Sequence, residues 1–418
     1  MKKVLLAGVP QSPNLGDGLI AYTMNRLIAM RGEHQVIHFD LLQGRCDKSM
    51  PMSSVRGGLH YSLASYAATP AASAMPAPLV RLNSNGSGKK MTPDTLRRLK
   101  AYWLHRRKDG VLNSQLRQAV KEAEAVYIGG GHLLIDTYWT FPLGVKRVML
   151  EAKRQGKPLH ILLVGARGPW SSQGRRWLLD ACRYATTIAV RDEDSRQFLL
   201  AQDSRLANKT ITLADPALYT PEAFGLAASS AKSIGAPTAH RTVGLGIMDP
   251  HEMNRHCELR WDREECAAWW NDATAALTAT GCTVKIFTNG AATDNAFVEH
   301  YVKPLCQGMK GVEFLPYPST VEQLVESIAE CDSVIAQRLH ACIPALALGK
   351  PTYGLIWDRK LENIFTDLGM SSYLIDFRKP AWAAVASVSE GHMPSERIVQ
   401  AIREKKEQLY DHIGRILP

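Results

Sequence analysis

Short apolar runs alternate with longer amphipathic stretches in two blocks of this 418-residue chain. In the first block, runs of strand length fall at residues 4–9, 36–39, 125–128, 160–164 and 187–190. In the second block, they fall at residues 242–247, 283–287, 333–336 and 352–356. Apolar runs of this length are typical of strands buried on both faces, and their alternation with helices predicts parallel sheets. The sequence therefore predicts an α/β protein with two Rossmann-like domains facing across a cleft.

Helical patterns separate these runs. They fall at residues 19–30, 94–108, 111–124, 145–154, 263–280, 296–305, 341–348 and 395–413. Two stretches rich in small residues and Pro interrupt the alternation, and we interpret residues 45–95 as a flexible insertion and residues 225–240 as a linker. The domains are then predicted at residues 1–225 and 241–418, and the terminal helix is assigned to the second.

Positive charge is concentrated in one part of the chain. The net charge is +10, and residues 81–110 hold nine Lys or Arg against two Asp, which accounts for most of it. A local basic segment favours peripheral contact with an anionic membrane surface over nucleic-acid binding. The alternative is a solvated basic helix that contacts nothing.

Cysteine spacing and hydropathy indicate the compartment. The eight Cys residues form no C-x-x-C pair, which predicts reduced thiols. We expect no secretory signal and no membrane span, because no apolar stretch approaches ~20 residues. A cytoplasmic protein, peripheral at the inner membrane face, is the resulting expectation.

Cationic side chains follow several of the predicted strands. Arg191 follows the run at 187–190, Arg338 and His340 follow the run at 333–336, and Lys360 follows the run at 352–356. Ligands of open α/β sheets bind at this carboxyl edge of the strands. Arg holds carboxylate or phosphate through two hydrogen bonds, Lys acts as a point charge, and His titrates near neutral pH. The pattern predicts an anion site with a proton donor. The alternatives are structural ion pairs and a buried His that is already hydrogen-bonded.

Two glycine-containing turns follow other predicted strands. Asn14, Gly16 and Asp17 come after the first run, where Asn14 or Asp17 can cap a helix and Asp17 can hold an acceptor hydroxyl. Gly130 and Gly131 belong to a triple-glycine turn whose N–H groups can cradle an anion. Ordinary turns are the alternative at both places.

Other motifs give no support to metal or nucleotide chemistry. Asp192 and Asp194 superficially match a metal-binding D-x-D, but acidic residues are favoured where a helix begins, without any metal. His251, His256, Cys257 and Cys266 fit no compact zinc pattern. No P-loop, G-x-G-x-x-G, G-x-S-x-G or H-E-x-x-H sequence occurs.

Seven short motifs, each weak alone, occur in one order along nearly the whole chain. They are Asn14-x-Gly16-Asp17, Gly129-Gly130-Gly131, Gly165-x-x-Gly168-Pro169, Arg191-Asp192-x-x-Ser195, Asp215-Pro216-Ala217, Arg338-x-His340 and Gly349-x-Pro351…Asp358-x-Lys360. In this order they resemble the polysaccharide pyruvyltransferase family. The resemblance implies a GT-B-like fold. It also implies transfer of a pyruvyl group from phosphoenolpyruvate to a sugar of an exopolysaccharide or cell-surface polysaccharide precursor, as a cyclic ketal, with release of phosphate.

The resemblance also implies roles for individual residues. Arg191, Arg338 and Lys360 are expected to bind the carboxylate and phosphate of the donor, and His340 is expected to be the catalytic acid. The remaining candidates for an acceptor or donor loop are Asn14, Gly16, Asp17, Gly130, Gly131 and Asp294. No metal and no cofactor beyond the donor substrate is expected, and the acceptor is expected to be lipid-linked. A nucleotide-sugar glycosyltransferase of GT-B type and a non-catalytic partner in polysaccharide assembly are the alternative functions.

Overall fold

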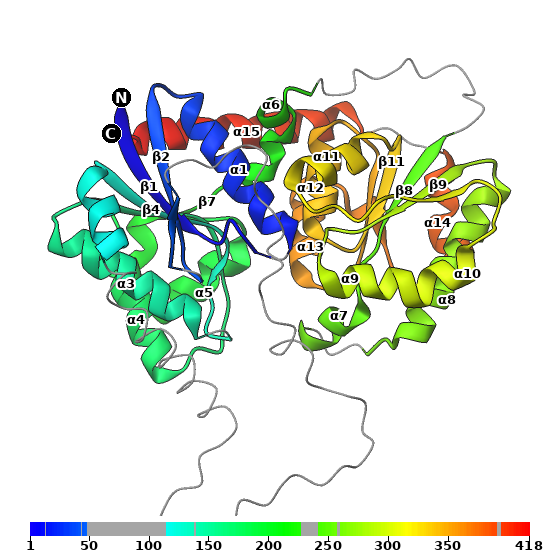
Figure 1. Ribbon diagram of the computed structural model, residues 1–418, viewed down its shortest axis with the longest axis horizontal. Coiled ribbons are helices and arrows are strands. Elements are labelled where there is room, and N and C mark those ends of the chain that lie inside the picture. The colour runs from blue at the N-terminus through cyan, green and yellow to red at the C-terminus, as the bar shows by residue number, and fades with distance from the viewer. Residues whose placement is uncertain are drawn as a thin grey trace, which may run out of the picture.

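The chain folds into two lobes, each built on a sheet of mainly parallel strands between layers of helices (Figure 1). The computed structural model describes residues 1–12, 14–42, 44–47, 114–137, 139–226, 241–256, 260–390 and 394–418. The predicted linker and insertion lie almost entirely outside these ranges, and the basic segment 81–110 lies wholly outside them. The α/β fold with two facing Rossmann-like sheets is confirmed.

The first lobe contains a seven-stranded sheet in the order β3-β2-β1-β4-β5-β6-β7. Its strands are β1 (Lys2–Gly8), β2 (His34–Asp40), β3 (Cys46–Asp47), β4 (Ala125–Leu134), β5 (Leu159–Ala166), β6 (Thr187–Val190) and β7 (Thr210–Thr212). All neighbours are parallel except β2 and β3. The strand order reverses between β1 and β4, and this is where such sheets bind ligands.

The second lobe contains a six-stranded parallel sheet in the order β10-β9-β8-β11-β12-β13. Its strands are β8 (Thr242–Gly246), β9 (Thr283–Phe287), β10 (Val312–Phe314), β11 (Ser333–Ala336), β12 (Thr352–Leu355) and β13 (Leu374–Ile375). The reversal lies between β8 and β11. The site residues that follow β11 therefore emerge at the switch point of this sheet.

The helices connect successive strands and cover both faces of each sheet (Figure 1). They are α1 (Leu15–Ala29), α3 (Thr140–Arg154), α4 (Ser172–Tyr184), α5 (Glu193–Gln202), α6 (Thr220–Phe224), α7 (Pro250–His256), α8 (Arg263–Ala279), α9 (Ala292–Phe297), α10 (Lys303–Cys306), α11 (Val321–Ala329), α12 (Leu339–Ala347), α13 (Arg359–Asp367), α14 (Ala381–Glu390) and α15 (Glu396–Ile416). Short turns of 3-10 helix are η2 (Ser204–Lys209), η3 (Pro216–Tyr219) and η5 (Ser371–Tyr373), and η4 (Val298–Val302) is a π-helical turn.

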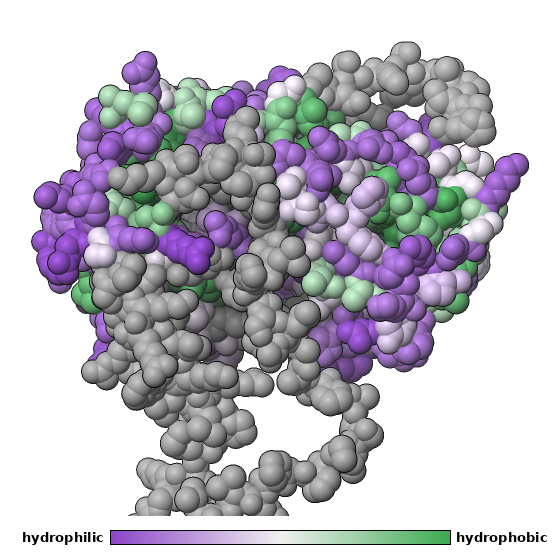
Figure 2. All heavy atoms as spheres, viewed as in Figure 1, coloured by the Kyte–Doolittle hydropathy of each residue, from purple (hydrophilic) through white to green (hydrophobic). Residues whose placement is uncertain are grey.

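Where Figure 2 colours the residues, the surface is mostly hydrophilic with smaller apolar patches, because the helices turn their apolar sides toward the sheets. No helix in the described ranges combines the length and the apolarity needed to cross a membrane.

The two lobes share buried apolar contacts. Leu19 of α1 lies in one cluster with Val321 of α11 and Ile343 of α12, and Leu15 packs among core residues of the second lobe. The Leu15 N–H also donates to the Asn289 carbonyl, 3.2 Å away, across the lobes. Helix α1 thus holds the carboxyl edges of the two sheets in a fixed relation.

Helix α15 returns from the second lobe to the first, where both termini lie (Figure 1). Near its start, Ile398 packs in the core of the second lobe. Near its end, Leu409 and Ile413 pack with residues of the first sheet, and Tyr127 Oη donates to the Ile416 carbonyl at 2.6 Å. The sequence assigned this helix to the second domain, but the structure shares it between the lobes. The boundary at residues 225–240 stays a prediction.

We predict that Leu409→Ala lowers the free energy of unfolding by about 2–5 kcal/mol, because it removes a fully buried side chain beneath α15. Denaturant titration followed by circular dichroism measures the change. Val399→Ala is the matched control, because Val399 lies on the same helix and is 46% exposed. A Leu409 variant as stable as that control would show that α15 contributes little to the first lobe.

Candidate active site

The carboxyl edges of the two sheets meet at the boundary between the lobes, and buried charged side chains collect there. Arg191 follows β6 and Asp215 follows β7 in the first lobe. Arg338 and His340 follow β11 in the second lobe. Arg191, Asp215 and His340 are each less than 10% exposed. Since buried charges are costly unless they are paired, their partners define the site.

Backbone geometry fixes Arg338 and His340. Strand β11 ends at Ala336, and Arg338 keeps an extended conformation at the position before α12. Gln337 anchors the turn on both sides, because its Oε1 accepts from the Met248 N–H at 2.8 Å and its carbonyl accepts from Trp357 Nε1 at 2.6 Å. His340 stands in the first turn of α12 and departs from helical geometry. The local fold thereby directs both side chains to the lobe boundary.

Asp215 joins the lobes through its carboxylate. Its Oδ2 lies 3.3 Å from Arg191 Nη1 and 3.3 Å from His340 Nε2, and its Oδ1 accepts from the Ala217 N–H at 3.0 Å. Burial alone would raise the pKa of Asp215. The charge and hydrogen bond of His340, together with Arg191 and the Ala217 N–H, outweigh burial and lower the pKa to about 2.

Gly16 packs directly against His340. A Cβ atom on Gly16 would lie 2.7 Å from His340 Cβ and 2.8 Å from Nδ1, distances that no real side chain tolerates. Asn14 caps α1 by accepting from the Gly16 N–H at 3.2 Å, which confirms the predicted cap. The turn after β1 therefore brings the first lobe into contact with the imidazole.

Lys360 joins a group of cations at the boundary. It is half-buried in the first turn of α13. Burial lowers the pKa of Lys360 to about 8, with further lowering by the positive charges of Arg191 and Arg167 and opposing effects of Asp358 and Asp192. Among the residues that the structure describes, Lys360 Nζ has no hydrogen-bond or ion-pair partner. A lysine in this setting favours the binding of an anion.

Arg191 has a second partner in the first lobe. Its Nη2 lies 3.2 Å from His132 Nδ1, and His132 fills the space beside Gly165, where a Cβ atom would be 1.9 Å from the ring. The guanidinium is thus fixed by Asp215 on one side and by His132 on the other. Neither of these partners was assigned a role from the sequence.

The buried carboxylate of Asp294 holds the Arg338 side chain in place. Its Nε and Nη2 donate to the two oxygens of Asp294 at 2.9 and 2.8 Å, and Asp294 is fully buried. Burial raises the pKa of Asp294, and Arg338 opposes that rise. Asp294 also accepts from the Asp249 N–H at 3.1 Å, while Asp249 pairs with Arg263 at 2.7 Å. Direct contact of Asp294 with a substrate stays a prediction, because in this structure its oxygens serve Arg338.

The triple-glycine turn lies against α1. Gly130 and Gly131 have φ values of 76° and 94°, a region that side chains rarely adopt. A Cβ atom on Gly130 would collide with Ile20 at 2.7 Å, and one on Gly131 would lie 3.6 Å from Asp17 Oδ1. Gly130 thus permits close packing of β4 and α1, while Gly131 borders Asp17 at the switch point. A role in substrate binding stays a prediction for Gly130, Gly131 and Asp17.

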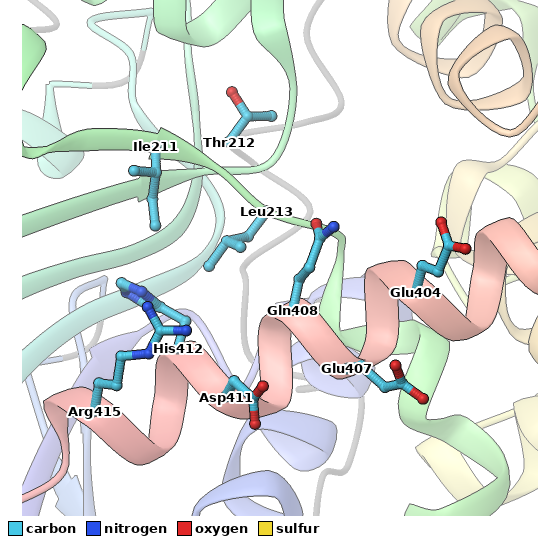
Figure 3. Close-up of a pocket in the computed structure, with 9 residues that line it drawn as sticks. All are labelled: Ile211, Thr212, Leu213, Glu404, Glu407, Gln408, Asp411, His412 and Arg415. Carbon is cyan, nitrogen blue, oxygen red and sulfur yellow. The ribbon is translucent and has the colours of Figure 1, made fainter.

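Two cavities lie near this boundary. A cavity of 60 Å³ is bordered by Arg191, Asp215 and Ile343. A wider groove of 460 Å³ lies between β7 and α15, where His412 and the acidic side chains of α15 line it (Figure 3). The wider groove contains none of the predicted site residues. We therefore take the buried charge network, and not the wider groove, as the candidate active site.

The fold defines a structural class. Two Rossmann-like sheets with their carboxyl edges opposed form a GT-B-like fold. Solved structures agree. The UDP-GlcNAc 2-epimerase of Methanocaldococcus jannaschii has a TM-score of 0.52 at 11% identity, covering 98% of this chain and 100% of that one. The S. aureus MnaA–UDP co-structure has a TM-score of 0.50 at 10% identity, covering 99% and 96%.

The family follows from a wider sequence match. Residues 14–359 match the family described as polysaccharide pyruvyl transferase, and the chain belongs to that family. It is therefore a transferase, and the reaction of its family is transfer of a pyruvyl group to polysaccharide. No curated protein matches the chain. The resemblance inferred from the seven motifs is thus confirmed.

We predict that Gly16→Ala lowers kcat at least tenfold without unfolding the protein, because the new methyl group displaces the His340 ring. Steady-state phosphate release measures kcat, and thermal unfolding reports the stability. If Gly16→Ala keeps kcat within twofold of the native enzyme, the contact between α1 and His340 has no part in turnover.

Proposed function

We propose that the protein transfers the pyruvyl group of phosphoenolpyruvate to two hydroxyls of one saccharide. The product is a cyclic ketal, and inorganic phosphate is released. One observation carries the proposal: the cations Arg191 and Arg167 both act on Lys360, and Arg191 is paired with the Asp215 that also contacts His340. A small, highly charged donor that must also receive a proton suits this combination.

Each cation suits a particular part of the donor. Lys360 supplies a point charge that forms no ion pair in the described part of the chain, although Asp358 and Asp192 act on it at longer range. Phosphate binding would offset the repulsion from Arg191. Arg338 presents a guanidinium fixed in orientation by Asp294. A rigid planar cation recognises a carboxylate with little loss of side-chain freedom. We assign Arg191, Arg338 and Lys360 to donor binding on these grounds.

The chemistry begins with a proton. In the proposed reaction, an N–H bond of His340 breaks and a C–H bond forms at the methylene carbon of phosphoenolpyruvate, leaving oxocarbenium character at the neighbouring carbon. One acceptor hydroxyl adds there. The phosphate then departs as the second hydroxyl adds. Of the two hydroxyl protons, one replaces the proton lost by His340 and the other leaves with phosphate. The cations stabilise the leaving phosphate in a site largely closed to water.

The residues that we propose for acceptor binding lie around the start of α1. Asn14 and Asp17 lie at the amino end of α1, next to the Gly16 contact with His340. We propose that their side chains hold acceptor hydroxyls, since carboxylate and amide groups accept and donate hydrogen bonds to sugars. A lipid-linked acceptor and peripheral membrane contact through residues 81–110 extend this proposal, and those residues lie outside the described ranges.

We predict that His340→Gln lowers kcat by ~10²–10⁴-fold while phosphoenolpyruvate still binds, because Gln can keep the hydrogen bond to Asp215 but cannot deliver a proton. Phosphate release measures turnover, and calorimetric titration measures donor binding. His300→Gln is the control, since His300 is exposed in the same lobe and its loss should leave kcat unchanged.

The same assay distinguishes the proposed donor from a nucleotide sugar. Phosphoenolpyruvate with a saccharide acceptor should yield phosphate and a pyruvylated product by mass spectrometry, whereas UDP-sugars should yield neither product nor thermal stabilisation. Transfer from a UDP-sugar would refute the proposed donor and favour a glycosyltransferase.

We predict that donor affinity falls as the pH rises through about 8. Lys360 is protonated below its pKa of about 8, so the cation that attracts the donor is present at pH 7 and is lost at pH 9. The donor phosphate has a second pKa near ~6 and is already fully ionised across this range. Titrations at several pH values should show the fall in the native protein and not in Lys360→Met. An equal fall in both would remove Lys360 from donor binding.

A further inference from the structure

The hydrogen bonds of Asp215 identify which ring nitrogen of His340 carries a proton. Arg191 and His340 share its Oδ2, and the Ala217 N–H occupies its Oδ1. The side chain of Asp215 is 2% exposed. With a pKa of about 2, Asp215 is ionised at neutral pH and can only accept hydrogen bonds. The hydrogen at the contact with His340 must therefore be on Nε2.

The opposite side of the imidazole faces a different environment. Nδ1 lies toward Gly16, and the space that a residue-16 side chain would occupy is 2.8 Å from this atom. Any side chain at residue 16 would displace the ring, so glycine lets His340 keep this position beside the amino end of α1. The ring thus has one nitrogen bound to a buried carboxylate and the other directed at the turn that follows β1.

We propose that Asp215 is a positioning residue that holds the Nε2 proton of His340, so that Nδ1 is the atom that delivers the proton to the donor. This inference rests on the proposed function, in which His340 protonates phosphoenolpyruvate. In the step, the Nδ1–H bond breaks, the C–H bond of the new methyl group forms, and the Nε2–H bond to Asp215 stays intact. The first hydroxyl proton then restores Nδ1–H. The same division of roles between the two ring nitrogens operates when a carboxylate orients a catalytic imidazole.

The two halves of this acid come from different lobes. Asp215 follows β7 in the first lobe, and His340 follows β11 in the second. The proton donor is therefore complete only while the carboxyl edges of the two sheets are in contact.

The test separates Asp215 from the donor-binding cations. Asp215→Asn keeps the side-chain shape, removes the charge and weakens the hold on both Arg191 and His340. His132→Ala is the matched variant, because it removes the other Arg191 contact and leaves His340 untouched. We expect both to change the KM for phosphoenolpyruvate by similar factors. We expect kcat to fall ~10–10³-fold in Asp215→Asn and by less than about threefold in His132→Ala.

A double-mutant cycle with His340→Gln provides the decisive readout. If Asp215 acts through His340, adding Asp215→Asn to His340→Gln lowers kcat by less than about threefold. Effects that multiply in the double mutant, or a kcat of Asp215→Asn within threefold of the native enzyme, would overturn the inference and leave the proposed function standing. Native-like turnover by His340→Gln would instead overturn the proposed function.

One measurement does not depend on the stability of Asp215→Asn. Nitrogen-15 spectra of histidine-labelled native protein, assigned by loss of signals in His340→Gln, report which ring nitrogen of the neutral imidazole carries the proton. We expect the Nε2–H tautomer. An Nδ1–H tautomer would overturn the inference.

Discussion

A buried carboxylate between two cationic or titratable partners is the interaction on which the lobe boundary depends. Asp215 is almost inaccessible to water, and its ionised state exists because Arg191, His340 and a backbone N–H replace the lost solvation. Removing any one partner leaves charge uncompensated in a poorly solvated place. The boundary between the lobes is therefore held by a polar network as well as by the apolar contacts of α1.

Side chains that orient the candidate site residues are as much a part of this site as the candidate reactive groups. Arg338 is oriented by the buried Asp294, and Arg191 is oriented by Asp215 and His132. Lys360 differs, because repulsion and burial lower its pKa and nothing in the described part of the chain pairs with it. Rigid arginines with one unpaired lysine form a site prepared for an anion before the anion arrives, and binding then costs little reorganisation.

Much of the fold could be predicted from the sequence, because apolar runs of four or more residues and amphipathic helices leave clear patterns. The runs at 187–190, 283–287 and 333–336 coincide with β6, β9 and β11. Strands of two or three residues, such as β7 and β13, carry too little periodicity to detect. The overlooked β7 precedes Asp215, so the residue had a motif but no position at a sheet edge. Helix α1 begins at Leu15, four residues before its predicted start, because Asn14 supplies the cap.

Site partners were harder to predict than site residues. Strand ends suggested Arg191, Arg338, His340 and Lys360, but Asp215 and His340 are 125 positions apart and Arg338 and Asp294 are 44 apart. Spacing along the chain contains no signal for such pairs, because they form only when two sheets oppose their edges. The packing of α15 on the first sheet could not be predicted for the same reason. Its apolar stripe shows that it packs on something, and only the tertiary structure shows that this is the first sheet.

The packing of α15 on the first sheet has a consequence for folding during synthesis. Leu409 and Ile413 cover residues of β1 and β4, and His34 Nε2 lies 3.4 Å from the Pro418 carbonyl. Strands β1 and β4 thus obtain part of their apolar cover from a helix that lies much later in the sequence. Until α15 is synthesised, this face of the first sheet is without that helix, and a nascent chain must be kept from aggregating for that interval.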